Sequence, residues 1–287
     1  MIYITGSNGF VGKNLISFLK KKKKKYFKIR RSKFCKATKS NYQYLPTIID
    51  KKNNILIHLS SPSLVRLYRE KNYTLKTVSD CLKNELGNAS SLVDYCKKNK
   101  FQKLIYMSTS SIYGPRNYKA PFTEKSNPNP KNDYAKIKLK VEDFIKKEFK
   151  NTIIVRPFQI YGKYDNPKRL IPTLVKAKKN KKLFLQNCLQ VTDLIHVDDL
   201  CQAIYNILKS KIYNGIYNLG SGEPIKLRDI VEIIHNQKNQ SFSFTYEKTL
   251  NSRIDNYCYA NINSLKNIFK WSPKVFLNKN TIKSIKI

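Results

Sequence analysis

With 287 residues the chain is long enough for one sizeable core, or for a core domain with a smaller part appended, and none of its apolar runs approaches the length of a membrane span. Its 47 Lys and nine Arg dominate a formal net charge of +37, but they are spread along the chain, whereas a nucleic-acid surface would gather its charge on one face. The six Cys are scattered without a Cys-x-x-Cys pair, and no charged leader precedes an apolar stretch, so we expect reduced thiols, no metal site and a soluble, cytoplasmic protein.

Short apolar runs alternate with longer helical patterns through the first half of the chain. The predicted strands are 2–5, 26–30, 55–59, 104–107 and 152–156, and the predicted helices are 11–24, 74–99 and 133–149. Strand–helix alternation of this kind predicts right-handed crossovers. We therefore predict an α/β fold over residues 1–160, a doubly wound parallel sheet with helices on both faces.

The first predicted helix ends in a run of lysines, Lys20 to Lys25. Cations are favourable at the C-terminus of a helix because they face the negative end of its dipole. We interpret the run as solvated lysines rather than as a polyanion site. Some non-specific binding to nucleic acid at low salt is still expected.

After Pro157 the alternation loosens. Helices are predicted near 168–180, 198–209 and 226–237, separated by loops rich in Gly, Pro and Asn. Residues 161–287 are predicted to form a smaller, mainly substrate-binding region, with some segments returning to the core. A ligand would lie above the carboxyl ends of the parallel strands.

Three glycines, Gly6, Gly9 and Gly12, separate the first strand from the first helix. A dinucleotide pyrophosphate requires backbone N–H groups at the positive end of a helix dipole, and glycines let the backbone approach without a Cβ. Because the glycines stand between an apolar strand and an amphipathic helix, the segment predicts a cofactor-binding turn. Its contacts would come from Gly6, Gly9, Phe10, Val11 and Gly12.

The end of the second strand indicates which dinucleotide is bound. An acid there would bond the ribose 2′-hydroxyl, whereas an Arg accommodates a 2′-phosphate. The chain has Arg30 and Arg31 at this point and no acid from 26 to 37. We predict NADP, with NAD as the alternative. A basic strand end without a 2′-phosphate contact would show the same two Arg, since the whole protein is basic.

A Tyr four residues before a Lys places both side chains on one helix face. In this chain the spacing carries no information by itself, because 19 Tyr and 47 Lys give about 3 such pairs by chance. The three that occur are Tyr134/Lys138, Tyr164/Lys168 and Tyr205/Lys209. The first pair differs in its context: Thr109 and its neighbouring hydroxyls follow an apolar strand 25 residues upstream, and Asn132 and Asp133 are candidate helix caps.

Taken together, these residues resemble the extended short-chain dehydrogenase/reductase superfamily, in its NAD-dependent epimerase/dehydratase branch, which has a Rossmann fold. The resemblance runs over nearly the whole chain. It includes the glycine turn, Ile57-His58-Leu59, the segment 108–114, Tyr134/Lys138 with Glu142, the segments 156–162, 193–199 and 217–222, and Trp271-Ser272-Pro273.

The resemblance implies a role for each candidate residue. Tyr134 would be the acid/base at a sugar hydroxyl or ketone, Lys138 would lower its pKa and hold the nicotinamide ribose, and Thr109 would orient the reacting oxygen. Leu59, Ser60, Asn84 and Phe158 would line the cofactor, and Ser110, Gln159 and Arg253 would contact the nucleotide sugar. Four residues depart from the usual family pattern: Ser60, Ser61, Gln159 and Thr192.

The family pattern also limits the reaction. Its 4,6-dehydratases carry an Asp-Glu pair after the catalytic Thr, and Ser110-Ser111 occupies those positions, so elimination of water is not expected. Net reduction of a 4-keto-6-deoxy nucleotide sugar and 4-epimerisation of a nucleotide sugar with tightly bound NAD stay open. The paired Arg places the reductase first. A catalytically silent NADP-binding module is a further alternative, and a homodimer through the helices near 74–99 and 133–149 is common in this family.

Overall fold

The structure is a computed structural model that describes residues 1–29, 45–48, 53–61, 64, 74–177, 181–185, 189–237, 242–246 and 256–285. The chain divides into two compact units. The first comprises Met1–Ile112, Pro128–Arg156 and Leu208–Tyr217, and the second comprises Tyr113–Asn127, Pro157–Ile207 and Asn218–Ile287. Each unit has its own cluster of buried apolar side chains.

A six-stranded sheet in the order β2-β1-β3-β4-β5-β9 organises the first unit. The strands are β1 (Ile2–Thr5), β2 (Tyr26–Ile29), β3 (Ile55–His58), β4 (Lys103–Met107), β5 (Thr152–Pro157) and β9 (Gly215–Leu219). The pairings from β2 through β5 are parallel, which confirms the predicted doubly wound sheet. Because β2 and β3 flank β1 on opposite sides, the chain reverses its direction of progress there, and parallel sheets bind ligands at such a switch point.

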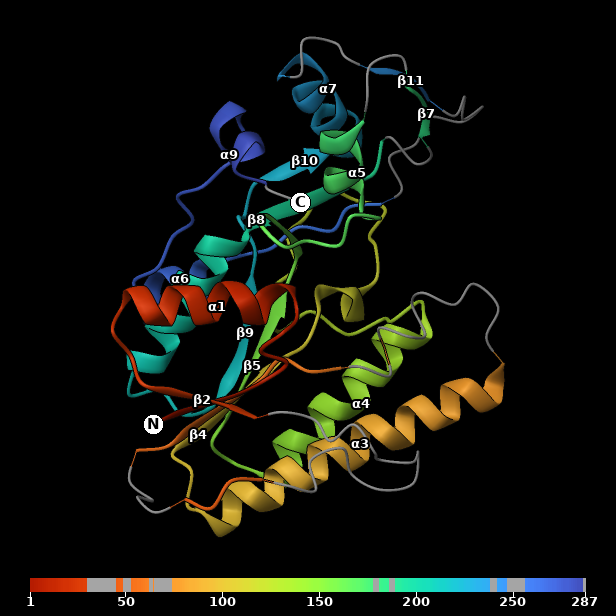
Figure 1. The fold of residues 1–287 in the computed structure, drawn as a ribbon. Helices are drawn as coiled ribbons and strands as arrows, with labels where there is room; N and C mark the ends of the chain where they lie inside the picture. The colour runs from red at the N-terminus through yellow and green to blue at the C-terminus, as the bar shows by residue number, and fades with distance from the viewer. Residues whose placement is uncertain are drawn as a thin grey trace. The chain divides into compact units, whose positions relative to one another are not determined.

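Three predicted helices cover this sheet: α1 (Phe10–Lys21), α3 (Leu75–Lys98) and α4 (Asp133–Glu148). Figure 1 shows α3 and α4 side by side against one face of the sheet, with α1 on the other face. The side chain of Thr74 caps α3, and Asn132 caps α4 by accepting a 2.9 Å hydrogen bond from the N–H of Ala135. The caps fix where both helices begin, since each satisfies an N–H group of a first turn.

The second unit contains two small sheets that the sequence did not reveal. One has the order β10-β8-β6, from Pro224–Lys226, Val191–His196 and Gln159–Tyr161, and the other pairs β11 (Phe242–Tyr246) with β7 (Lys181–Leu185). The predicted helices are present as α5 (Leu170–Lys176), α6 (Val197–Lys209) and α7 (Leu227–Gln237). Two short helices, α8 (Asn263–Phe269) and α9 (Lys279–Ser284), complete the described part of this unit.

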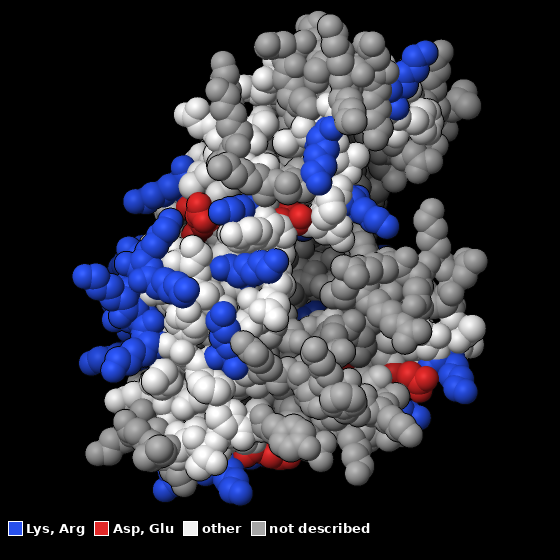
Figure 2. All heavy atoms as spheres, in the orientation of Figure 1, with Lys and Arg blue, Asp and Glu red and all other residues white. Residues whose placement is uncertain are grey.

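The basic residues are mainly a surface feature of the described chain. The run Lys20 to Lys25 is exposed, with Lys20 and Lys21 in the last turn of α1 as predicted. On the face drawn in Figure 2, blue Lys and Arg side chains greatly outnumber red Asp and Glu. Among the described residues, no helix combines the length and apolar character needed to cross a membrane.

The glycine turn sets a steric limit that can be tested. A Cβ on Gly12 would lie 2.2 Å from the Gly6 carbonyl oxygen, well inside the van der Waals contact distance. The turn must therefore distort to accept a side chain at this position. Gly12→Ala is expected to lower the free energy of unfolding by about 2 kcal/mol or more, the scale of an overpacked site. Chemical denaturation measures this loss.

Gly87→Ala is the matched control, because nothing lies within 4 Å of a Cβ at this position of α3. Its expected effect is a gain of about 0.5–1 kcal/mol, since Ala favours a helix over Gly. Equal effects of the two substitutions would contradict the packing described for Gly12.

Candidate active site

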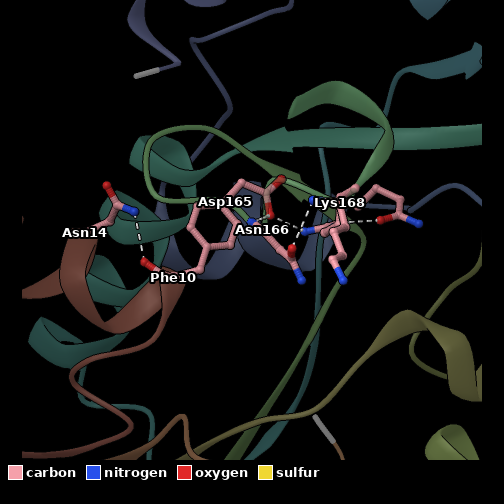
Figure 3. A network of polar contacts seen from close by, with 7 residues as sticks. Phe10, Asn14, Asp165, Asn166 and Lys168 are labelled. Atoms are coloured by element: carbon pink, nitrogen blue, oxygen red, sulfur yellow. Dashed lines mark hydrogen bonds and ion pairs between the residues drawn. The ribbon is translucent and has the colours of Figure 1, made fainter. Parts of the chain in front are cut away.

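The turn between β1 and α1 brings backbone unusually close to the end of β3. Gly6 has a φ of +68°, and a Cβ there would lie 2.9 Å from the carbonyl carbon of Leu59 and from the nitrogen of Ser60. The N–H of Gly9, the N-cap of α1, donates to the Gly6 carbonyl at 3.0 Å. Asn14 then donates from Nδ2 to the Phe10 carbonyl at 2.9 Å, within the first turns of α1 (Figure 3).

A hydrogen-bonded link between Thr5 and His58 joins the carboxyl ends of β1 and β3. The Thr5 Oγ1 lies 2.7 Å from Nδ1 of His58 and accepts from the N–H of Leu59 at 3.2 Å. Burial, and secondarily the charge of Lys138, lowers the pKa of His58 to about 3. His58 is therefore neutral at physiological pH, and its ring holds the two strand ends together without adding charge.

Lys138 reaches from α4 to the carboxyl edge of the sheet. Its Nζ donates to the carbonyl of Met107, the last residue of β4, and to Oγ of Ser61 beyond β3, both at 2.8 Å. The same nitrogen lies 4.7 Å from the centroid of the Tyr106 ring, a cation–π contact. Burial lowers the pKa of Lys138 to about 8, and the carboxylates of Glu85 and Glu142 oppose that effect.

Tyr134 lies in the first turn of α4, one turn before Lys138 and on the same face of the helix. It is half-buried and packs against the apolar cluster of the first unit. The Asn132 cap fixes the start of α4 and with it the position of Tyr134 along the helix. A phenol and an ammonium group thus share one helix face near the end of β4.

Thr109 follows β4 by two residues and is held in a tight turn. Its Oγ1 donates to Oγ of Ser111 at 3.1 Å and accepts from the N–H of Ser111 at 3.2 Å. Ser110 begins the 3-10 helix Ser110–Tyr113 and is buried, as is Thr109. Hydroxyl groups therefore line this strand end, and neither residue that follows Thr109 carries an ionisable acid.

The sequence profile of the NAD-dependent epimerase/dehydratase family matches residues 2–220. The chain belongs to this family. Among its characterised relatives, the GDP-6-deoxy-D-talose 4-dehydrogenase of Aggregatibacter actinomycetemcomitans is 28% identical over 240 residues, which cover 81% of this chain and 78% of the relative. A dTDP-D-glucose 4,6-dehydratase of Dictyostelium discoideum is 27% identical over 272 residues, covering 82% of this chain and 61% of the relative.

Solved structures of similar fold carry both forms of the dinucleotide. The NADPH complex of RMD from Pseudomonas aeruginosa superimposes with a TM-score of 0.79 at 19% identity, covering 99% of this chain and 96% of that one. UDP-glucuronic acid 4-epimerase from Bacillus cereus, with UDP-glucuronic acid and NAD, gives a TM-score of 0.76 at 23% identity, with the same coverage. These likenesses establish the Rossmann fold of the family for this chain.

The first unit holds most of the residues predicted for the family's cofactor and catalytic sites. The glycine turn, Leu59 and Ser60 meet at the switch point, while Thr109, Tyr134 and Lys138 come from the end of β4 and from α4. Phe10 and Val11 open α1, and Asn84 is half-buried on α3.

Two further predicted residues, Phe158 and Gln159, belong to the second unit. Phe158 is buried, whereas Gln159 is exposed and accepts from Nη2 of Arg169 at 2.7 Å. Arg169 also donates to Asp165 at 3.0 Å, and Asp165 accepts from the N–H of Asn166, which is labelled with it in Figure 3. Arg169 therefore fixes the amide oxygen of Gln159. The predicted contacts of Arg30, Arg31 and Arg253 lie outside the described residues.

Sequence reasoning missed three polar residues around Lys138 and Thr109: Ser61, Ser111 and Glu85. Ser61 and Ser111 stand next to predicted site residues, so their positions just beyond strand ends were the available signal. Glu85 is buried in α3, within the helix predicted for residues 74–99. No cluster of three or more His, Cys, Asp or Glu suited to a metal ion occurs in the part of the chain that the structure describes.

Beneath the site, Glu142 of α4 and Arg156 of β5 form a fully buried ion pair. The guanidinium donates from Nε to Oε1 at 3.1 Å and from Nη2 to Oε2 at 2.6 Å. Removing one partner leaves the other charge unpaired in the core, so Arg156→Met is expected to cost about 3–5 kcal/mol of unfolding free energy. Urea denaturation monitored by circular dichroism measures the loss.

Two further variants separate charge from packing. Replacing both partners, as Glu142→Leu with Arg156→Met, is expected to recover most of the stability because no unpaired charge is left. Arg228→Met breaks an exposed pair with Glu232 and is expected to cost less than about 1 kcal/mol. A loss for Arg156→Met no larger than that for Arg228→Met would contradict the role assigned to the buried pair.

Proposed function

We propose that this protein is an NADPH-dependent reductase that converts the 4-keto group of a 4-keto-6-deoxy nucleotide sugar to a hydroxyl. The observation that carries the proposal is the placement of Lys138. Its ammonium group is held at the carboxyl edge of β3 and β4, on the helix face that also bears Tyr134. This is the edge at which ligands bind to parallel sheets.

The glycine turn fits a dinucleotide. Side chains at Gly6 and Gly12 would collide with backbone atoms, so only glycine at these positions allows this tightly packed turn next to the N-terminus of α1. Gly6, Gly9, Phe10, Val11 and Gly12 would hold the pyrophosphate there, because that helix end attracts anions. Leu59, Ser60, Asn84 and Phe158 would line the remainder of the cofactor, and Lys138 would bond the hydroxyls of the nicotinamide ribose.

The chemistry follows from three side chains. When bound, NADPH supplies the hydride that is added to C4 of the sugar. The phenol of Tyr134 donates its proton to the C4 oxygen, which completes the hydroxyl, and the phenolate regains a proton from solvent. The Lys138 ammonium favours that phenolate because opposite charges stabilise each other. Thr109 would orient the reacting oxygen by turning its one hydroxyl proton, which Ser111 accepts in the structure, toward that oxygen.

The hydroxyls beyond Thr109 favour this reaction over dehydration. Elimination of water requires an acid and a base beside the sugar, and Ser110 and Ser111 are neutral groups with high pKa values. Ser111 is engaged with Thr109 through two hydrogen bonds, so it supports the orienting hydroxyl. A relative named for a 4-dehydrogenase acting on a 6-deoxy nucleotide sugar agrees with chemistry at C4, because that oxidation is the reverse of the proposed reduction.

The substrate would be held mainly by residues 161–287, with Ser110 at the reacting end. Gln159 would contact the nucleotide sugar through its amide nitrogen, since Arg169 occupies the amide oxygen. Arg253 would contact a phosphate, and Thr192 stands where many relatives place an Arg. Because Thr192 lacks the charge of that Arg, the nucleotide that this chain prefers can differ from the one that its relatives bind.

Tyr134→Phe removes the proposed acid while keeping the ring. Turnover is expected to fall by about 10²–10⁴-fold, the usual contribution of general acid–base catalysis, with little change in the Kd for NADPH. Steady-state kinetics and fluorescence titration measure the two effects. Tyr205→Phe is the matched control, because Tyr205 and Lys209 have the same spacing on α6. Unchanged turnover in Tyr134→Phe would refute the catalytic assignment.

The choice of cofactor separates a reductase from an epimerase. Protein purified without added cofactor is expected to contain no retained NAD by mass spectrometry and to consume NADPH with a 4-keto-6-deoxy nucleotide sugar. Arg30→Ala or Arg31→Ala is expected to weaken NADPH binding by about tenfold or more and to leave NADH binding unchanged, because each removes a charged contact to the 2′-phosphate.

Lys24→Ala, an exposed basic residue beyond α1, is the control for general charge effects. If the purified protein retains NAD tightly and interconverts 4-epimers, the proposed reductase is refuted and the protein is a 4-epimerase. NADH binding tighter than NADPH binding, unaffected at Arg30 and Arg31, would contradict the 2′-phosphate contact.

A further inference from the structure

The hydroxyl of Ser61 is one of two groups that accept hydrogen bonds from the buried ammonium of Lys138. Lys138 is 4% exposed, and its Nζ donates to Oγ of Ser61 and to the Met107 carbonyl, both at 2.8 Å. An ammonium group has three N–H donors and no acceptor. Two of the three are therefore used within the protein. In the part of the chain that the structure describes, the third has no hydrogen-bond acceptor, so it is the one that a ligand can use.

Ser61 is the only side chain among the described residues that accepts a hydrogen bond from Lys138, since the other acceptor is a backbone carbonyl. Its place beyond β3 depends on the glycine turn. A Cβ on Gly6 would lie 2.9 Å from the carbonyl carbon of Leu59 and from the nitrogen of Ser60, so the turn packs directly against the two residues before Ser61. The Ser61 hydroxyl therefore joins Lys138 of α4 to a segment whose position the glycine turn fixes.

We propose that Ser61 is a positioning residue, whose hydroxyl holds the Lys138 ammonium at the carboxyl edge of β3 and stabilises its protonated form. The inference rests on the proposed catalytic role of Lys138, although the hydrogen bond itself needs no substrate. Ser61 does not touch the reacting atoms. It acts through Lys138, whose charge favours the phenolate of Tyr134.

Replacing Ser61 by another neutral residue leaves every charged and titratable group around Lys138 in place. These groups come from five elements: Tyr134 and Glu142 of α4, Glu85 of α3, Arg156 of β5, Tyr106 of β4 and His58 of β3. A changed Lys138 titration in such a variant therefore reports the lost hydrogen bond rather than a changed charge. Because a hydrogen bond to the charged form of a group favours that form, its loss is expected to lower the pKa of Lys138.

Heteronuclear NMR of protein with 13C-labelled lysine tests this effect in the ligand-free protein. Lys138 and Lys103 should both titrate near pH 8 in the wild type, because burial lowers the pKa of each to about 8. The signal absent from Lys138→Arg identifies Lys138. In Ser61→Ala the Lys138 titration is expected to move down by about one pH unit, the scale of one hydrogen bond to a charged group, while Lys103 stays as an internal reference.

Two larger variants separate the hydroxyl from the space that it fills. Thr and Val have nearly the same shape, but only Thr carries a hydroxyl that accepts a hydrogen bond. Lys138 is expected to titrate in Ser61→Thr as in the wild type, and at least about one pH unit lower in Ser61→Val. This pair stays decisive if water replaces the lost hydroxyl in Ser61→Ala, because the second methyl of Val occupies that place. Equal Lys138 titrations in Ser61→Thr and Ser61→Val would overturn the proposal.

Activity gives a second readout. If the titration moves from about 8 to about 7, turnover of Ser61→Ala should fall about fivefold at pH 8 and change little at pH 6, where Lys138 is protonated in both proteins. Ser91→Ala, which removes a hydroxyl that donates to the Gly87 carbonyl at 3.1 Å within α3, should leave the pH profile unchanged.

A purely structural role for Ser61 would lower turnover of Ser61→Ala equally at both pH values, and that result would also overturn the proposal. Absence of NADPH-dependent reduction by the wild-type protein would refute the proposed function. The lysine titrations of the ligand-free variants would still decide whether Ser61 supports the charge of Lys138.

Discussion

Burial of the Lys138 ammonium removes a charge from water, and the surrounding structure has to replace what water provided. The Met107 carbonyl and the Ser61 hydroxyl accept its hydrogen bonds, and the ring of Tyr106 presents its electron-rich face. Each of these partners lies at or just beyond the carboxyl end of a parallel strand. The ammonium therefore joins the ends of β3 and β4 to α4, and its position depends on the register between these two strands.

The glycine turn and the lysine are connected through the end of β3. Gly6 fits against Leu59 and Ser60 because it has no side chain, and Thr5 reaches His58 across the same edge. Ser61 follows directly and accepts from Lys138. A segment of four residues, 58 to 61, thus contacts the proposed pyrophosphate turn at one end and the proposed catalytic lysine at the other. Displacing this segment would disturb both sites, so the proposed cofactor binding and the proposed proton transfer both depend on the position of residues 58 to 61.

The periodicity of the first unit made its fold predictable, whereas the second unit offered little pattern to interpret. Five strands and three helices followed from apolar runs of the right length. Strands such as β6 and β10 have three residues each, too short for an alternation to be recognised. Glu85 could have been found, because it continues the buried stripe of α3 from Cys81 to Ala89 at helical spacing. Its surroundings could not, since the packing of α3 against α4 depends on tertiary structure.

Lys103 shows why a lowered pKa alone does not identify a catalytic group. It opens β4, is as deeply buried as Lys138, and has a pKa lowered to about 8. Its Nζ donates to the carbonyls of Ser210 and Ile212 beyond α6, so it fastens a loop at the amino end of the strand. Lys138 binds the carboxyl end of the same strand. Ligands of parallel sheets bind at carboxyl ends, so the end of β4 that each ammonium group lies near, rather than its pKa, separates a structural lysine from the proposed catalytic one.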